Sequence, residues 1–255
     1  VAIVIFGVMA ATLTVFVRPA FEAYLAVRDR ADLAAQAGHA LARMQADVRA
    51  AVPNSIRTPA ANCIEMLPTR GGGRYRRAAD TVNDSAPGCA PGASCSAPLD
   101  PTQATTVFDV LTPLNPVPAP GDFVVVDNQN PGDVYAGSNR AAIGAVAVPA
   151  AAYGRHRITV AATAFPAGYD GGRFVVVPAS QRAVFYVCSG ADGTLDANGN
   201  GRGTLVRLSS YGFNAAYPAA CPATASPEPR QPRHHGPRPR TRQRSRDYNP
   251  PGGMA

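Results

Sequence analysis

The chain has 255 residues and a formal net charge of +7, and all 24 of its basic residues are arginine. Seven of these arginines lie in the tail that begins at Pro222, beside two acids, so the rest of the chain carries 17 arginines against 15 acids. This nearly neutral body gives no electrostatic case for nucleic-acid binding, and its size without the first 52 residues and the tail, about 170 residues, is that of one domain.

The first 52 residues have the pattern of one helix. No charged residue lies between Val1 and Val17, and from Phe21 to Val52 apolar residues recur mostly every three or four positions between charged ones. This pattern is typical of a helix that is apolar in its first half and amphipathic in its second. We therefore expect a helix over residues 1–52 whose first 17 residues span a membrane. The side chains expected to face lipid or neighbouring helices are Ile3, Ile5, Phe6, Val8, Leu13 and Phe16.

Two other interpretations of the apolar run are weaker. A cleaved signal peptide ends in a break, whereas the helical pattern continues past the candidate cleavage site Val8-Met9-Ala10. A buried core helix would fit the length, because a span needs about 20 apolar residues, but a core helix seldom continues into charged surface helix. The chain starts without methionine, which favours a membrane-spanning helix truncated at its N-terminus.

Beyond Pro53, which cannot donate the helical hydrogen bond, the pattern is that of a β domain. Runs of β-branched and aromatic residues are bounded by Pro, Gly and Asn. Strands are expected at residues 63–68, 107–111, 122–126, 145–148, 156–160, 173–177, 183–188 and 203–208. The last two runs should pair through a polar turn. The predicted fold class is α+β, with one long helix packed on an antiparallel sheet and a head over residues 53–221.

A triple glycine at residues 71–73, flanked by arginines, could be offered as a phosphate cradle. It lacks the Lys-Ser/Thr ending of a P-loop and a following apolar helix. A flexible turn is therefore the favoured interpretation.

A second loop matches the opening of a calcium site. Residues 196–201 have the expected spacing, but Arg207 stands at the twelfth position, where a bidentate glutamate belongs. We expect an ordinary hairpin turn and no metal or other cofactor. The weak calcium candidates are Asp196, Asn198 and Asn200.

The five cysteines predict disulfides in an oxidising compartment. Cys89 and Cys95 share one loop and are expected to pair. Cys63, Cys188 and Cys221 leave one thiol without a partner, and their pairing stays open. No Ser or Cys is combined with a His and an acid at an informative spacing, so no catalytic residue is assigned and no enzyme is expected.

Several stretches resemble one protein family. The apolar start, its charged continuation and the following sheet resemble a type IV pilin or pseudopilin, and the finer match is to the MshO family of minor pilins of the mannose-sensitive haemagglutinin (MSHA) pilus. The resemblance covers residues 1–218. It rests on Phe16-Val17-Arg18-Pro19, residues 43–49 with Pro53-Asn54-Ser55, residues 63–69 before Gly72-Gly73-Arg74-Tyr75, Asn128-Gln129-Asn130, Arg173-Phe174 and Val187-Cys188.

The resemblance implies a non-enzymatic minor pilin that acts in the assembly or initiation of an MSHA-type pilus. It implies a single-pass protein of the bacterial inner membrane, with its head in the periplasm, whose helix contacts lipid, the pilus assembly platform and other major and minor pilins. The leader, the processing site and the glutamate expected in this family would precede Val1. The alternatives are a minor pseudopilin of a type II secretion system and a membrane-anchored periplasmic binding or hydrolytic domain.

The tail from Pro222 to Ala255 is rich in Pro and Arg and poor in aliphatic residues. Such a segment cannot bury apolar surface, so we expect it to be disordered. Its arginines would suit an anionic partner. The favoured interpretation is a reading-frame slip near Cys221, because GC-rich DNA read out of frame yields Arg, Pro, Gly and Ala.

Overall fold

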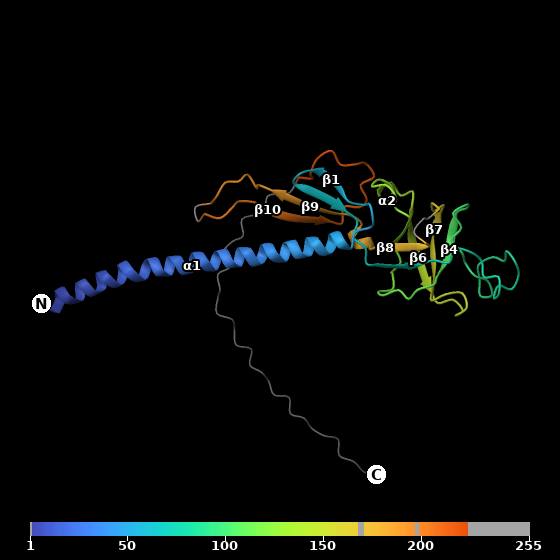
Figure 1. Cartoon of the computed structure of the whole chain (residues 1–255), viewed down its shortest axis with the longest axis horizontal. Helices are drawn as coiled ribbons and strands as arrows, with labels where there is room; N and C mark the ends of the chain where they lie inside the picture. Colours follow the sequence, from blue (N-terminus) through green and yellow to red (C-terminus); the bar gives the residue numbers. More distant parts are fainter. Residues whose placement is uncertain (1, 168–170, 197–198, 224–255) are drawn as a thin grey trace, which may run out of the picture. The chain divides into compact units, whose positions relative to one another are not determined.

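The computed structural model describes residues 2–167, 171–196 and 199–223. Residues 1–224 form one compact unit, in which a long helix precedes two antiparallel sheets (Figure 1). The α+β class and the long N-terminal helix are therefore as predicted, whereas the tail from residue 224 lies outside the described residues. The helices are α1 (Ala2–Arg49), α2 (Asp133–Ala136) and the 3₁₀ turn η1 (Ala179–Gln181).

The first sheet has four strands in the order β1-β2-β9-β10 and packs on the C-terminal part of α1. Its strands are β1 (Arg57–Ala60), β2 (Cys63–Met66), β9 (Val184–Ser189) and β10 (Thr204–Ser209). The predicted hairpin between the last two strands is present, with Thr204 opposite Ser189 and Ser209 opposite Val184. Met44 and Val48 of α1 pack against buried side chains of this sheet, so the helix is fixed to the head at this end.

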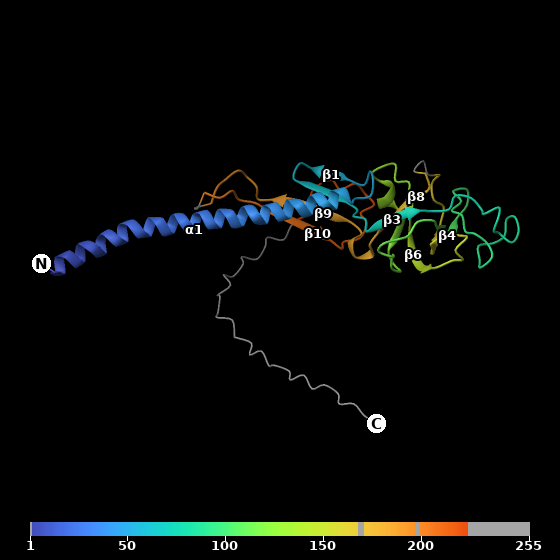
Figure 2. The ribbon, with the colours of Figure 1, turned by 60° about the horizontal axis from the view of Figure 1, so that its bottom comes forward.

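The second sheet has six strands in the order β3-β8-β5-β6-β7-β4 (Figure 2). Its strands are β3 (Gly71–Arg74), β4 (Thr105–Val110), β5 (Phe123–Val126), β6 (Arg140–Ala147), β7 (His156–Thr163) and β8 (Arg173–Val177). A bridge between Tyr75 and Val110 brings its two edges together, so the sheet closes on itself. Alternate side chains point inward, and Phe108, Val124 and Phe174 belong to the core that fills the interior.

The triple glycine forms strand β3, and the expectation of a flexible turn is wrong. Gly72 lies against the main chain of β8, where a Cβ atom would stand 2.3 Å from the carbonyl oxygen of Phe174. Only glycine permits so close an approach of two strands. The glycines are therefore explained by sheet packing.

No helix among the described residues is long and apolar enough to cross a membrane. The expected membrane span over residues 1–17, and with it the single-pass inner-membrane location, is therefore wrong. The uncharged part of α1 ends at Arg18, which pairs with Glu22 at 2.9 Å. The helix continues past these charges, but the uncharged run of 17 residues is shorter than the length of about 20 apolar residues that a span requires.

Candidate functional site on the long helix

The N-terminal half of α1 carries an exposed row of apolar side chains, which we call the apolar stripe. Its members are Ile5, Met9, Phe16, Ala20 and Val27, at successive spacings of four and seven residues. These spacings return to one face of a helix and form the repeat by which helices pack side by side. The four large side chains are 53%, 61%, 75% and 66% exposed in chain order, so most of their surface is open.

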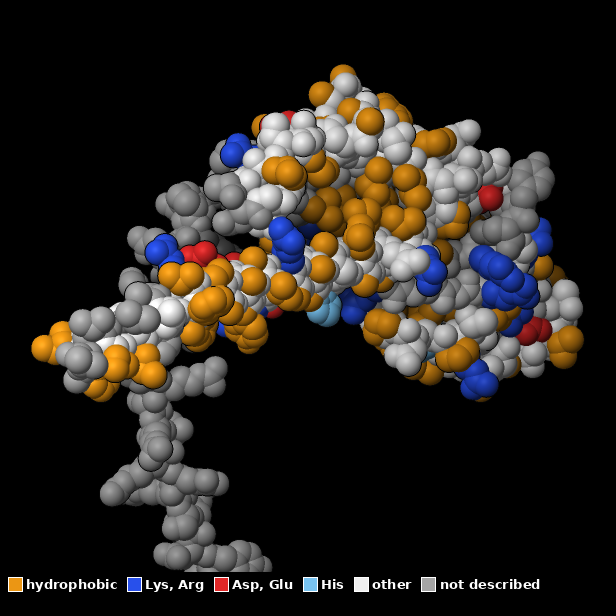
Figure 3. Space-filling view, turned by 60° about the vertical axis from the view of Figure 1, so that its left-hand side comes forward, with side chains coloured by type: hydrophobic (Ala, Val, Ile, Leu, Met, Phe, Trp, Pro, Cys, Tyr) orange, Lys and Arg blue, Asp and Glu red, His pale blue; other side chains and the backbone are white. Residues whose placement is uncertain are grey.

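From Arg18 onward, the face of α1 opposite the stripe, here called the polar face, carries charged and amide side chains together with Leu25, which is 51% exposed. Arg18, Glu22, Asp29 and Gln36 are all exposed and follow each other at spacings of four and seven residues. Hydrophobic side chains gather along the helix where it extends from the sheets (Figure 3). A row of exposed apolar side chains along one helix is the pattern of a helix that packs against a partner.

The side chains singled out in the sequence fall on or near this surface. Ile5 and Phe16 belong to the apolar stripe, and Ile3 and Phe6 are also exposed. Val8 and Leu13 lie within α1, but their side chains are outside the described part of the structure. A shallow apolar depression on this part of the helix is lined by Phe16, Val17, Ala20, Phe21 and Tyr24.

Asp47 joins α1 to the first sheet. Its carboxylate accepts hydrogen bonds from the hydroxyl of Tyr186 at 2.7 Å and from Nε of Arg207 at 2.8 Å. Arg207 also donates to the side chain of Gln181 at 2.6 Å. Burial opposes ionisation of Asp47, but the two hydrogen bonds and the positive charges of Arg207 and Arg43 together outweigh it and lower the pKa of Asp47 below its usual 3.8.

Replacing Asp47 with asparagine is expected to destabilise the folded chain by about 1.5–3 kcal/mol at neutral pH, because it removes hydrogen bonds to a charged group. Since the folded-state pKa is lowered, this stabilisation is complete above the unfolded-state pKa and is lost as the pH falls through the folded-state value. Urea unfolding at several pH values measures the effect, which should shrink below about pH 4. The control is Asp32→Asn on an exposed part of α1, and an equal effect of both would contradict this role.

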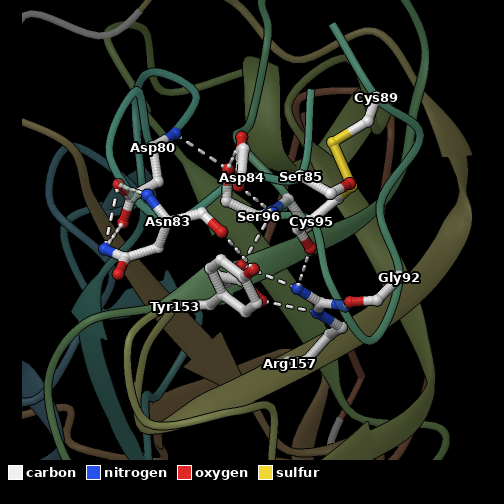
Figure 4. The surroundings of a disulfide bond; sticks show 12 residues. Asp80, Asn83, Asp84, Ser85, Cys89, Gly92, Cys95, Ser96, Tyr153 and Arg157 are labelled. Atoms are coloured by element: carbon white, nitrogen blue, oxygen red, sulfur yellow. Dashed lines mark hydrogen bonds and ion pairs between the residues drawn. A yellow bond between two sulfur atoms is a disulfide. The ribbon is translucent and has the colours of Figure 1, made fainter. Parts of the chain in front are cut away.

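A disulfide joins Cys89 to Cys95 in the long loop before β4, as predicted (Figure 4). Arg157 holds this loop: its guanidinium donates to the carbonyl oxygens of Gly92 and Cys95, and it binds Asp109 at 2.6 Å. Hydrogen bonding to Asp109 raises the pKa of Arg157, which keeps the guanidinium charged. The loop is therefore fastened to the second sheet and presents a fixed surface.

The described residues on either side of the candidate calcium loop are paired, with Leu195 opposite Gly201. Asp196 and Asn200 are joined by main-chain hydrogen bonding, and the main-chain amide of Asn200 also donates to Oδ1 of Asp196 at 2.8 Å. Asn198 lies outside the described residues. Among the residues that are described, no group of three acidic, His or Cys side chains could hold a metal ion.

The structure settles the cysteine pairing that the sequence left open. Cys63 of β2 and Cys221 form a disulfide across 158 residues, and Cys188 is the free thiol. Nothing in the local sequence around either cysteine predicts this pair, because it depends on how the last described segment returns to β2. The disulfides expected from the cysteine content are thus present.

A cleft of about 690 Å³ beside the end of α1 was not predicted. Asn54 and Asp127 line it with φ angles of 60° and 48°, a left-handed conformation that is uncommon outside glycine. The side chain of Asn54 donates to the carbonyl of Asn128 at 3.0 Å, and that of Asn128 donates to the carbonyl of Pro53 at 2.7 Å. These bonds fasten the loop after β5 to the end of the helix.

Comparison of the chain with protein-family models, with curated proteins and with solved structures found no match. The resemblance to minor pilins therefore stays a prediction.

Proposed function

We propose that this chain is a minor pilin that acts in the assembly or initiation of an MSHA-type type IV pilus, and that its apolar stripe packs against the helices of other pilins. The observation that carries the proposal is the exposure of this stripe along a helix whose other end is fixed to the head. Full burial of a large apolar side chain contributes about 1.5–3 kcal/mol, so a partner that covers the stripe gains substantial affinity.

The position of the head on α1 supports this function. The contacts of Met44, Asp47 and Val48 with the first sheet lie near the C-terminal end of the helix. The part of α1 before Glu22, where the turn between β9 and β10 approaches the helix at Asn200, has 20 residues and is about 30 Å long, so it has room for helical neighbours. The head then remains available to present the fastened Cys89–Cys95 loop at the surface of the assembly.

Replacing Phe16 with aspartate is expected to reduce recovery of the chain in sheared filaments at least tenfold. A carboxylate buried in an apolar helix contact costs several kcal/mol, and about 1.4 kcal/mol corresponds to a factor of ten. The measurement is an immunoblot of the filament fraction from cells in which the variant replaces the natural chain.

The matched control is Gln36→Asp, which adds the same charge on the polar face of α1. Both variants should keep the thermal stability of the parent, because both positions are exposed. Equal recovery of the Phe16→Asp variant and the parent would contradict the proposal.

Deletion of the gene distinguishes a minor pilin from a minor pseudopilin. If the chain is a minor pilin, the deletion should abolish surface filaments. If it is a pseudopilin, the deletion should instead abolish protein secretion.

A further inference from the structure

The last described segment of the head, residues 210–221, is held in place mainly by side chains, and we call it the C-terminal arm. Within the described residues, no hydrogen bond between main-chain atoms joins this arm to another segment. The arm leaves β10 through Ser210 and Gly212, whose φ angles of 67° and 91° turn the chain. It therefore lies on the head without being part of either sheet.

Three aromatic side chains anchor the arm. The hydroxyl of Tyr211 donates to the buried carboxylate of Glu65 at 2.9 Å. Phe213 packs edge-on against Phe123, with ring centres 4.9 Å apart. The hydroxyl of Tyr217 accepts a hydrogen bond from the main-chain amide of Thr58 at 3.0 Å. All three partners belong to the body of the head, and we call the surface that they form beneath the arm the groove.

A buried arginine completes the groove. Arg57 is 2% exposed and stacks on Tyr135, with its guanidinium carbon 3.5 Å from the ring centre. Its Nη1 atom donates to the carbonyl oxygens of Asn214 and Ala216 at 2.8 and 3.1 Å. Its Nε atom donates to the carbonyl oxygen of Pro131 at 3.2 Å, so without the arm Arg57 would keep this bond and lose the two acceptors that the arm supplies.

The arm itself is far less buried than the groove. Tyr217 is 56% exposed, and Tyr211 is also exposed, whereas Glu65 and Tyr135 beneath the arm are fully buried. Once the Cys63–Cys221 disulfide is reduced, only side-chain contacts at the surface hold this segment, and it can then leave as one unit. The same contacts can then be made by the identical segment of another molecule, as in domain swapping.

We propose that the C-terminal arm is exchangeable, and that the groove around Arg57 accepts the arm of a second copy of this chain. The Cys63–Cys221 disulfide then joins two chains instead of closing one. Its formation removes two protons and two electrons from the thiols, and a disulfide oxidant such as oxidised glutathione takes up the electrons. This inference does not depend on the pilus function.

The test uses the full wild-type chain in unlabelled and ¹⁵N-labelled forms. The two forms are mixed, reduced without denaturant, and reoxidised with oxidised glutathione at increasing protein concentration. Mass spectrometry of the disulfide-linked peptides then reports whether each pair joins one chain or two. We expect mixed-label Cys63–Cys221 pairs whose share rises with concentration, because exchange between copies is bimolecular.

The chain supplies its own control. Cys89 and Cys95 are six residues apart in one loop, so their pair should stay within one chain. Cys63–Cys221 pairs that remain unmixed at every concentration would overturn the proposal. The proposal would also be overturned if mixed-label Cys89–Cys95 pairs, or mixed-label disulfides that contain Cys188, were as frequent as mixed-label Cys63–Cys221 pairs. Random disulfide exchange would then explain the result.

Discussion

The Phe108→Ala variant is expected to lose about 3–5 kcal/mol of unfolding free energy. Phe108 lies in β4 with no exposed surface, and its ring packs edge-on against Tyr75 and Phe174, with centres 6.4 and 5.6 Å away. Removing the ring of Phe108 leaves a cavity near the bridge between Tyr75 and Val110, which joins the two edges of the second sheet. Since domains are stable by about 5–15 kcal/mol, the loss is a large share of the total.

Urea unfolding of the full chain measures this loss as a lower midpoint with an unchanged slope. Val82→Ala, in the exposed part of the long loop, is the control and should stay within about 0.5 kcal/mol of the parent. A change below about 1 kcal/mol for Phe108→Ala would contradict a packed interior, because it would mean that no cavity forms.

The Arg57→Ala variant is expected to lose about 3–5 kcal/mol, because it breaks a buried ion pair. Nη1 of Arg57 lies 3.6 Å from Oε2 of Glu65, and both side chains are almost fully buried. The substitution leaves the carboxylate of Glu65 without its cationic partner. It also removes the two hydrogen bonds that hold the C-terminal arm.

This variant should also change the pH dependence of stability. Burial raises the pKa of Glu65 above 4.5, although Tyr211 and Arg57 act in the opposite direction. A carboxyl with a raised folded-state pKa contributes stability below its unfolded-state pKa and loses it as the pH rises through the folded-state value. The loss in Arg57→Ala should therefore be smaller near about pH 4 and larger near about pH 7.

Thermal unfolding at these two pH values checks the prediction, with Arg57→Met/Glu65→Leu as a second variant. Replacing both partners by apolar residues leaves no unpaired charge, so it should destabilise less than Arg57→Ala. Equal stability of Arg57→Ala and the parent at both pH values would show that the pair is not buried as described.

The features that the sequence predicts best depend on local pattern. The spacing of apolar residues predicts α1 almost to its end at Arg49, and β-branched runs predict the hairpin of β9 and β10. Strands β1 and β3 are not predicted, because the first contains Pro59 and the second three glycines, residue types that disfavour strands. Their pairing depends on the surrounding sheet, which the local pattern does not show.

The candidate sites also divide into those that the local sequence pattern predicts and those that depend on contacts between distant segments. The exposed residues Ile5 and Phe16 are visible in the apolar pattern, but hydropathy alone does not distinguish a membrane span from a surface for packing helices. The groove around Arg57 could not be predicted, since Arg57 and its acceptor at Asn214 come from segments more than 150 residues apart. An arginine in a short strand has no local sign that it will be buried.

The proposed contact between the apolar stripe and other pilins is tested most directly by photo-cross-linking in filament-forming cells. A photoreactive phenylalanine analogue is placed at Phe16 on the stripe and, as a control, at Asp29 on the polar face. We predict light-dependent adducts with other pilin subunits from position 16 and far fewer from position 29. Absence of pilin adducts at position 16, or equal yields at both positions, would contradict the proposed packing of α1.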